Sequence, residues 1–431
     1  MGRHRLTPLN HRKYRPRAQH PGTERAKLPV RAFLSIGVLT LLLIHPPKAS
    51  AQEPVPVDPI DSMPFRFGPV GVSPTLTITN FGIDTNVFND PNNPERDFTL
   101  TATPKVQARL RSGKVLLSGS LATGMNYYQK FSEERSVDYS ADGRGDLDFG
   151  WFKPYAFMSR LDTHERLNAE LDLRAPRVQN DVGVGARFES SPRTTLVVDG
   201  RHSKLTFDEA AVFDGVPLSH TLNSTTDVFE GGIEWKLTPL TTFSVLASHQ
   251  QDRFEQSPDR DSNSFRILPT IRMEAPAIVQ GTFAIGYRRF NGVDPTLPDY
   301  SGVVMKGTVG HTIAERTRVE LQLSRDVQYS FEVVEPYYLT TGIRATLTQQ
   351  LQEAMDVRVS VGRERLDYRA GSSAVSSSRV DRADVASVGV GYRVNPNLRV
   401  GVDLEFARRV SDRADRDYDR TRLVGSVAYG F

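Results

Sequence analysis

Histidine and serine side chains are the first candidates for chemistry, because a hydrolase needs a nucleophile held beside a general base. The adjacent residues His202 and Ser203 offer the two groups of a lipase-like pair. No Gly-x-Ser-x-Gly segment accompanies them, so the element that would present such a serine is missing. We therefore interpret the pair as polar residues near the end of a strand, and we predict that the chain is not an enzyme.

Metal ligands are the second candidates. The chain contains no cysteine, which excludes disulfides and thiolate metal sites, and no two histidines are four residues apart. Asp84, Asn86, Asn89 and Asp90 offer oxygen ligands of the kind that calcium prefers, but their spacing does not match a calcium-binding loop. A solvated polar turn explains them better, and we predict no metal and no cofactor.

Charged residues at every second position form a larger set. Within residues 98–110, apolar residues such as Leu100 and Val106 alternate with polar residues such as Lys105 and Arg109. Strict alternation predicts a strand with one apolar and one polar face. At about 3.3 Å per residue, a strand of this length fits a tilted membrane crossing better than a soluble sandwich.

The connections between these segments fall into two classes that alternate along the chain. One class is short, as at 111–114 and 151–154, and the other is generally longer and polar, as at 164–179 and 208–221. Short periplasmic turns and longer external loops are typical of outer-membrane barrels. The sequence therefore predicts an all-β fold, a transmembrane antiparallel up-and-down β-barrel of about eighteen strands, with sixteen as the alternative. In the first strand, a change of face near Asn80 predicts a β-bulge.

The first 51 residues have the features of an export signal. A basic n-region precedes the apolar run from Ala32 to Ile44, and Ala49-Ser50-Ala51 then supplies small residues for cleavage before Gln52. Residues 1–51 hold ten of the 54 basic residues and one of the 51 acidic residues. The remaining chain therefore has 44 basic and 50 acidic residues, which gives a formal charge of −6. The formal charge of +3 for the whole chain is therefore no argument for nucleic-acid binding by the exported protein.

Two further regions follow the signal peptide. Residues 52–74 carry six prolines and are predicted to form a periplasmic lead-in, with a plug inside the lumen as the alternative. Residues 75–431 form the predicted barrel. The last strand places Val427, Tyr429 and Phe431 on one face, a pattern that resembles the assembly signal read by the barrel-insertion machinery. An unpaired amphipathic strand of this kind can add to the edge of another sheet.

The charged residues of the polar strand faces are the best candidates for function, because they would line the lumen. An open channel would use them to screen solutes, whereas a closed barrel would pair them across the lumen. The longest loops have about fifteen residues, so we expect no firm plug and favour the open channel. The lumen-lining candidates are Lys105, Arg109, Asp142, Arg144, Asp146, Arg266, Arg272, Arg344, Arg358, Arg399 and Asp403.

The order of motifs resembles a family of outer-membrane β-barrel porins often associated with exopolysaccharide and exosortase gene clusters. The residues that carry the resemblance are Asp84-Thr85-Asn86-Val87-Phe88, Thr103-Pro104-Lys105-Val106-Gln107 and Asn126-Tyr127-Tyr128. Membership implies a porin-like barrel in the outer membrane of a Gram-negative cell, with outer-membrane lipid and the barrel-assembly machinery as partners.

Four functions follow from these features as alternatives. The first is passage of small hydrophilic solutes through a porin-like barrel. The second is a role in exopolysaccharide export or secretion, with polysaccharide as the partner. A closed structural barrel is the third and an enzyme the last.

Overall fold

The computed structural model describes residue 60, residues 63–371 and residues 379–431. The chain divides into two units, residues 1–52 and residues 53–431, and every described residue belongs to the second. The predicted signal peptide and its cleavage site before Gln52 lie outside the described residues. No helix in the described part of the chain is long and apolar enough to cross a membrane.

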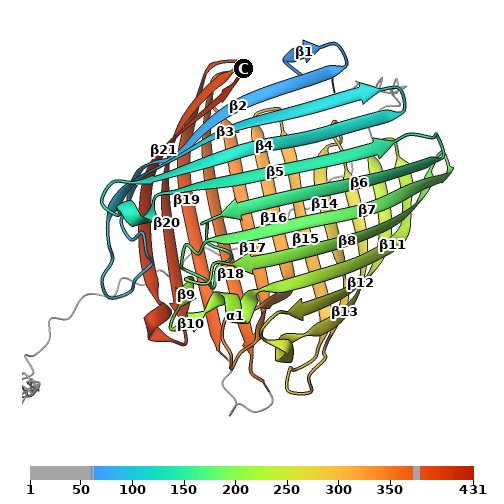
Figure 1. The fold of residues 1–431 in the computed structure, drawn as a ribbon. Coiled ribbons are helices and arrows are strands. Elements are labelled where there is room, and N and C mark those ends of the chain that lie inside the picture. Colours follow the sequence, from blue (N-terminus) through green and yellow to red (C-terminus); the bar gives the residue numbers. More distant parts are fainter. Residues whose placement is uncertain (1–59, 61–62, 372–378) are drawn as a thin grey trace, which may run out of the picture. The chain divides into compact units, whose positions relative to one another are not determined.

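The second unit is a closed antiparallel barrel, in which each strand pairs with its neighbours in the sequence (Figure 1). Strand β2 closes the barrel because it pairs with both β3 and β21. The strands are β2 (Val70–Asp84), β3 (Asp97–Ser112), β4 (Val115–Tyr128), β5 (Ser136–Leu147), β6 (Phe152–Thr163), β7 (Arg177–Ser191), β8 (Thr194–Phe207), β11 (Ser224–Thr238), β12 (Thr241–Phe254), β13 (Ser262–Met273), β14 (Val279–Gly292), β15 (Tyr300–Ile313), β16 (Thr317–Tyr329), β17 (Tyr337–Gln350), β18 (Met355–Arg369), β19 (Val380–Asn395), β20 (Leu398–Ser411) and β21 (Tyr418–Gly430). The prediction of eighteen barrel strands is confirmed within the described residues.

Shorter elements lie outside the wall. Strand β1 (Phe65–Phe67) pairs with the start of β2 at one end of the barrel, where the chain also ends (Figure 1). The opposite end carries the longer loops and is termed the external end, because outer-membrane barrels have longer external than periplasmic connections. Its elements are η1 (Ser132–Glu134), β9 (Val212–Phe213), β10 (Val216–Pro217), α1 (Leu218–Leu222), η2 (Pro258–Arg260) and η3 (Ala414–Arg416).

The alternation of side chains divides the wall into an outer and an inner face. Large apolar side chains at alternate positions are exposed, as for Val359 (43%) and Val361 (54%) on β18. A soluble protein would bury such residues, whereas in a membrane barrel they contact lipid. The polar residues between them therefore face the lumen, as the sequence predicts.

The first barrel strand differs from the prediction at its start. It begins at Val70 instead of Thr75, so Pro74 lies inside β2. The proline is tolerated because pairing with β21 begins only at Thr75, and Pro74 needs no N–H donor on that side. The predicted bulge near Asn80 is confirmed, since the register with β21 shifts between Ile78 and Phe81 and Asn80 has a φ of 53°.

Candidate functional site at the external mouth

The connection between β6 and β7, residues 164–176, crosses the lumen; we call it the mouth loop. From this loop, the Glu170 carboxylate accepts a hydrogen bond from Ser330 Oγ at 2.6 Å, in the β16–β17 connection. Arg409 of β20 donates to the carbonyl oxygen of Ala169 at 2.9 Å and to Asp172 Oδ2 at 2.9 Å. In sheet order, many strands separate β6 from β16 and from β20, so these contacts span the barrel. A loop of ordinary length therefore reaches across the lumen, and the expectation that no loop plugs the lumen firmly stays a prediction.

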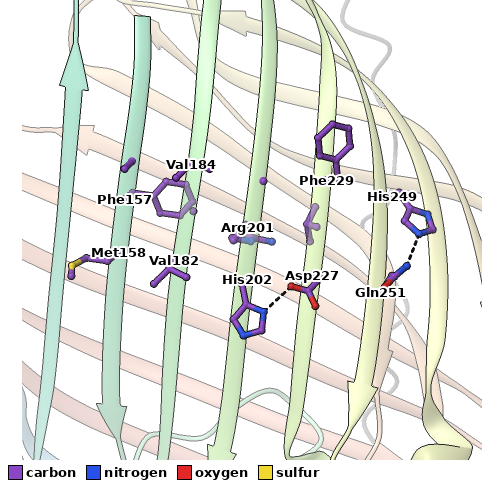
Figure 2. A pocket seen from close by; sticks show the side chains of 14 residues that line it. Phe157, Met158, Val182, Val184, Arg201, His202, Asp227, Phe229, His249 and Gln251 are labelled. Carbon is purple, nitrogen blue, oxygen red and sulfur yellow. Dashed lines mark hydrogen bonds and ion pairs between the residues drawn. The ribbon is translucent and has the colours of Figure 1, made fainter.

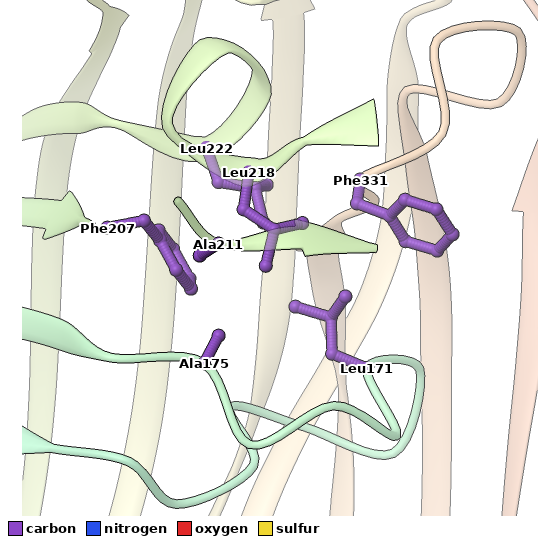
Figure 3. Close-up of a cluster of buried hydrophobic side chains, with 7 residues drawn as sticks. All are labelled: Leu171, Ala175, Phe207, Ala211, Leu218, Leu222 and Phe331. Carbon is purple, nitrogen blue, oxygen red and sulfur yellow. The ribbon is translucent and has the colours of Figure 1, made fainter. Parts of the chain in front are cut away.

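Apolar packing holds the mouth loop against two other external connections. Leu171 and Ala175 of the loop form a buried cluster with Phe207 at the end of β8 and with Phe331 (Figure 3). Leu218 of α1 completes its centre and is fully buried, as is Phe331. Burying a side chain of this size contributes about 1.5–3 kcal/mol, so this cluster is a substantial part of what keeps the loop in place.

Buried ion pairs fix the loop from the other side. Asp381 at the start of β19 accepts hydrogen bonds from Arg409 Nη2 at 2.5 Å and from Arg379 Nη2 at 2.7 Å. The side chains of Arg409 and Asp381 are both 0% exposed. Charges removed from water persist only with partners, and here each arginine meets a carboxylate. These pairs make the position of the loop specific.

A pocket rich in arginine lies between the mouth loop and the wall. The loop contributes Arg166 and Arg174, and β21 contributes Arg420 and Arg422. With Asp84 and Glu165 also in the lining, four arginines stand against two carboxylates in a cavity of 260 Å³. The lining residues therefore carry a net positive charge, which attracts anions to this cavity.

Hydrogen bonds position three of these arginines. Arg420 forms a bidentate pair with Asp84, whose two oxygens both lie 2.9 Å from Arg420 Nε. Arg422 Nη2 donates to Glu405 Oε1 at 2.6 Å. Arg166 donates to the carbonyl oxygens of Asp172 and Val87, each at 2.7 Å. Fixed in this way, the guanidinium groups present a preorganised cationic surface.

Arg174 differs from the other three. It lies over the ring of Tyr128, 4.9 Å from its centroid, and donates to the tyrosine hydroxyl. Its Nε and Nη2 atoms are buried and have no hydrogen-bond partner among the described residues, and the Glu134 carboxylate is 3.9 Å from Nε. Two donors of a permanent cation are thus unsatisfied beside the pocket, which suits an anionic acceptor.

The arginine pocket contains none of the lumen-lining residues that the sequence singles out. Arg420 and Arg422 could have been found, because they alternate with Leu423, Gly425 and Val427 in the last strand. The two loop arginines carry no such periodic signal. Asp84, considered for calcium, is instead neutralised by Arg420, and no group of three metal-binding side chains occurs in the described ranges.

The predicted lumen residues lie on the strand faces opposite the exposed apolar residues, and several form ion pairs. Arg144 Nη2 lies 2.7 Å from Asp146, Arg266 Nη1 lies 3.3 Å from Asp326, and Arg399 Nη2 lies 2.7 Å from Asp356. Arg358 and Arg399 share a polar pocket near the short-turn end, and Asp142 accepts from Ser120. The same strand faces carry Lys105, Arg109, Arg272, Arg344 and Asp403. Their role in lining a conducting lumen stays a prediction.

The last strand carries the predicted assembly signal on its apolar face. Val427 pairs with Ile78 of β2, and the rings of Tyr429 and Phe431 meet edge to face at 4.6 Å. Phe431 is 48% exposed. Recognition by the insertion machinery stays a prediction.

A larger cavity lies on the outer face of the wall, among Val182, Val184 and Phe229 (Figure 2). Here His202 Nδ1 contacts Asp227 at 2.7 Å, whereas Ser203 bonds to Asp181 on the inner face. His202 and Ser203 therefore lie on opposite faces of β8, and they do not form the lipase-like pair considered above.

Comparison with known proteins identifies a family. The family model described as "Putative beta-barrel porin 2" matches residues 58–431. No curated protein sequence matches the chain. Among solved structures, the outer membrane protein OpdK of Pseudomonas aeruginosa is 12% identical, with 84% of this chain and 99% of that chain covered and a TM-score of 0.48. OccK2 of Pseudomonas aeruginosa, in complex with glucuronate, is 9% identical, with coverages of 84% and 98% and a TM-score of 0.49. A BenF-like porin of Pseudomonas fluorescens is 10% identical, with coverages of 84% and 99% and a TM-score of 0.48.

Proposed function

Because the chain belongs to the beta-barrel porin family whose model matches residues 58–431, and is thus a porin-like barrel of the outer membrane, we propose that small anionic solutes pass through its lumen. The observation that carries the preference for anions is the arginine pocket beside the mouth loop. It combines four arginines, two carboxylates and the two unsatisfied donors of Arg174. A solute that passes the loop on this side meets a fixed positive field.

Electrostatics favours this reading over a neutral filter. A unit positive charge about 6 Å from a passing ion attracts an anion by about 0.7 kcal/mol in a water-like dielectric and repels a cation by the same amount, so it changes the ratio of anion to cation roughly tenfold. Removing two such charges therefore lowers the ratio of anion to cation permeability by up to roughly a hundredfold.

Reversal potentials of single channels in a salt gradient test the proposal. We expect the wild-type protein to conduct in discrete steps and to prefer anions. The double variant Arg174→Gln/Arg422→Gln should lose most of the preference. Arg272→Gln is the control, because it removes a single charge from the same lumen face outside the pocket, and it should lower the ratio much less than the double variant does.

Two outcomes would overturn the proposal. A conducting channel that prefers cations would remove the role of the arginine pocket. A folded barrel without conductance would remove solute passage itself and favour the structural barrel, since the mouth loop would then act as a permanent cover. Exopolysaccharide export rests on no observation in this structure.

A further inference from the structure

Arginines cluster on the outer face of the wall, just beyond its apolar band. On β18, the exposed residues Val359 and Val361 are followed at the same alternation by Arg363 and Arg365. On β20, Phe406 is followed by Arg408 in the same way. We define the outer arginine patch as Arg325 of β16, Arg363 and Arg365 of β18, Arg382 of β19 and Arg408 of β20.

One row of the patch is internally neutral. Arg363 pairs across the strands with Asp384, and its Nε lies 2.5 Å from Oδ1 of that residue. Asp384 is followed on the next strand by Arg408, which lies 3.7 Å from Asp419. Positive and negative charges thus alternate along this row, as stable cross-strand pairs require.

The adjacent row, one step nearer the external end, is not neutral. Arg365 and Arg382 are direct cross-strand partners, an arrangement that costs free energy when both are charged. Asp367 offsets Arg365 at 2.6 Å, but the side chain of Arg382 has no hydrogen bond or ion pair within the described ranges. Arg325 continues the row and, in the part of the chain that the structure describes, reaches only neutral acceptors, Thr341 Oγ1 at 2.7 Å and the carbonyl oxygen of Val303 at 3.3 Å. Five arginines therefore face three carboxylates.

The location of the patch selects the ligand. The outer face of a membrane barrel meets lipid, and the edge of its apolar band lies at the level of the headgroups. Arginine binds phosphate through two parallel hydrogen bonds and keeps its charge in this setting. A phosphate between Arg365 and Arg382 would relieve their repulsion, while the acyl chains of the same molecule would pack on Val359, Val361 and Phe406.

We propose that the outer arginine patch binds the phosphate groups of the glycolipid that forms the outer leaflet of the outer membrane. The site lies on the outside of the wall, and it does not depend on conduction through the lumen.

Native mass spectrometry of the purified protein in detergent tests this inference, with bis-phosphorylated lipid A as the probe. We expect lipid A to remain bound to the wild-type barrel and its dephosphorylated form to bind at least tenfold more weakly. The variant Arg365→Gln/Arg382→Gln should lose the same factor. Arg358→Gln is the matched control, because it removes an arginine from the lumen face of the same strand and should bind as the wild type does.

Folding is monitored separately through the heat-dependent shift of the barrel on denaturing gels. If this variant does not fold, the single substitution Arg382→Gln is used instead, because the Arg382 side chain has no partner among the described residues. We then expect a smaller loss of lipid A binding. Equal binding of both forms of lipid A, or wild-type binding by a folded variant, would overturn the inference.

Discussion

Replacing Glu170 by glutamine should remove most of the pH dependence of the mouth loop. Glu170 is 0% exposed, and its carboxylate is held by Ser330 Oγ and by the backbone N–H of Phe331. Burial raises the pKa of Glu170 from 4.5 to about 7, although the hydrogen bond from Ser330 and the charges of Arg379 and Arg409 act in the opposite direction. The docked loop therefore binds a proton more tightly than an undocked loop does.

The sign and size of the effect follow from linkage. A carboxyl group whose pKa is higher in the docked state stabilises docking at low pH, and the advantage is lost as the pH rises from about 4.5 through about 7. The full difference is about 3 kcal/mol. Between pH 5 and pH 8 it amounts to about 2.5 kcal/mol, so we expect the undocked population to rise roughly seventyfold.

Single-channel recordings between pH 5 and pH 8 measure this population as the time spent at a larger conductance. Glu170→Gln should keep the loop docked with little change across this range, and Glu165→Gln in the same loop is the control that should behave as the wild type does. His164 contacts Asp138 at the base of the loop, so any residual pH dependence is assigned with the added substitution His164→Gln. The reasoning is refuted if opening becomes rarer as the pH rises, or if Glu170→Gln opens with the wild-type pH dependence.

Three further predictions concern stability and assembly. Arg409→Met leaves the buried Asp381 with one arginine partner fewer, and it should lower the free energy of loop docking by about 3–5 kcal/mol. The loss is measured as faster tryptic cleavage in the mouth loop. Unchanged cleavage would show that the pair is dispensable. Phe331→Ala empties the centre of the apolar cluster and should cost about 3–5 kcal/mol in the same assay, whereas Val333→Ala, which is 63% exposed, should cost little. Removal of Phe431 should reduce insertion into outer membranes in cells with little change in the urea midpoint of the folded barrel; normal insertion would contradict its role as an assembly signal.

The barrel could be predicted from the sequence because its signals are local. Alternation with a period of two can be recognised within each strand, and the contrast between short and longer connections can be recognised from one connection to the next. Together these two patterns predict the eighteen strands. Even the bulge at Asn80 leaves a local change of face. The start of β2 was missed because Pro74 suggests the end of regular structure, although its missing N–H falls where no partner strand needs it.

The mouth loop could not be predicted in the same way. Its length is ordinary, and its path depends on partners far along the chain, such as Ser330 and Arg409, which lie 160 and about 240 residues away. The arginine pocket could not be predicted from the sequence for the same reason, because half of its arginines come from the loop. Only Arg420 and Arg422 follow the alternation of polar and apolar residues in the last strand, from which they could have been predicted.

The separation along the chain between the mouth loop and its partners also determines the order in which contacts form during assembly. The loop precedes Ser330, Asp381 and Arg409 in the chain, so its anchors exist only after the strands that carry them have joined the wall. Contacts of such high sequence separation form late, since the chain between them must be ordered first. The pairing of β2 with β21 joins residues that are still further apart, so by the same reasoning the circumference closes last, when the mouth loop already has its anchors. The seam between β2 and β21, and not the mouth, would then be the last path for leakage to close.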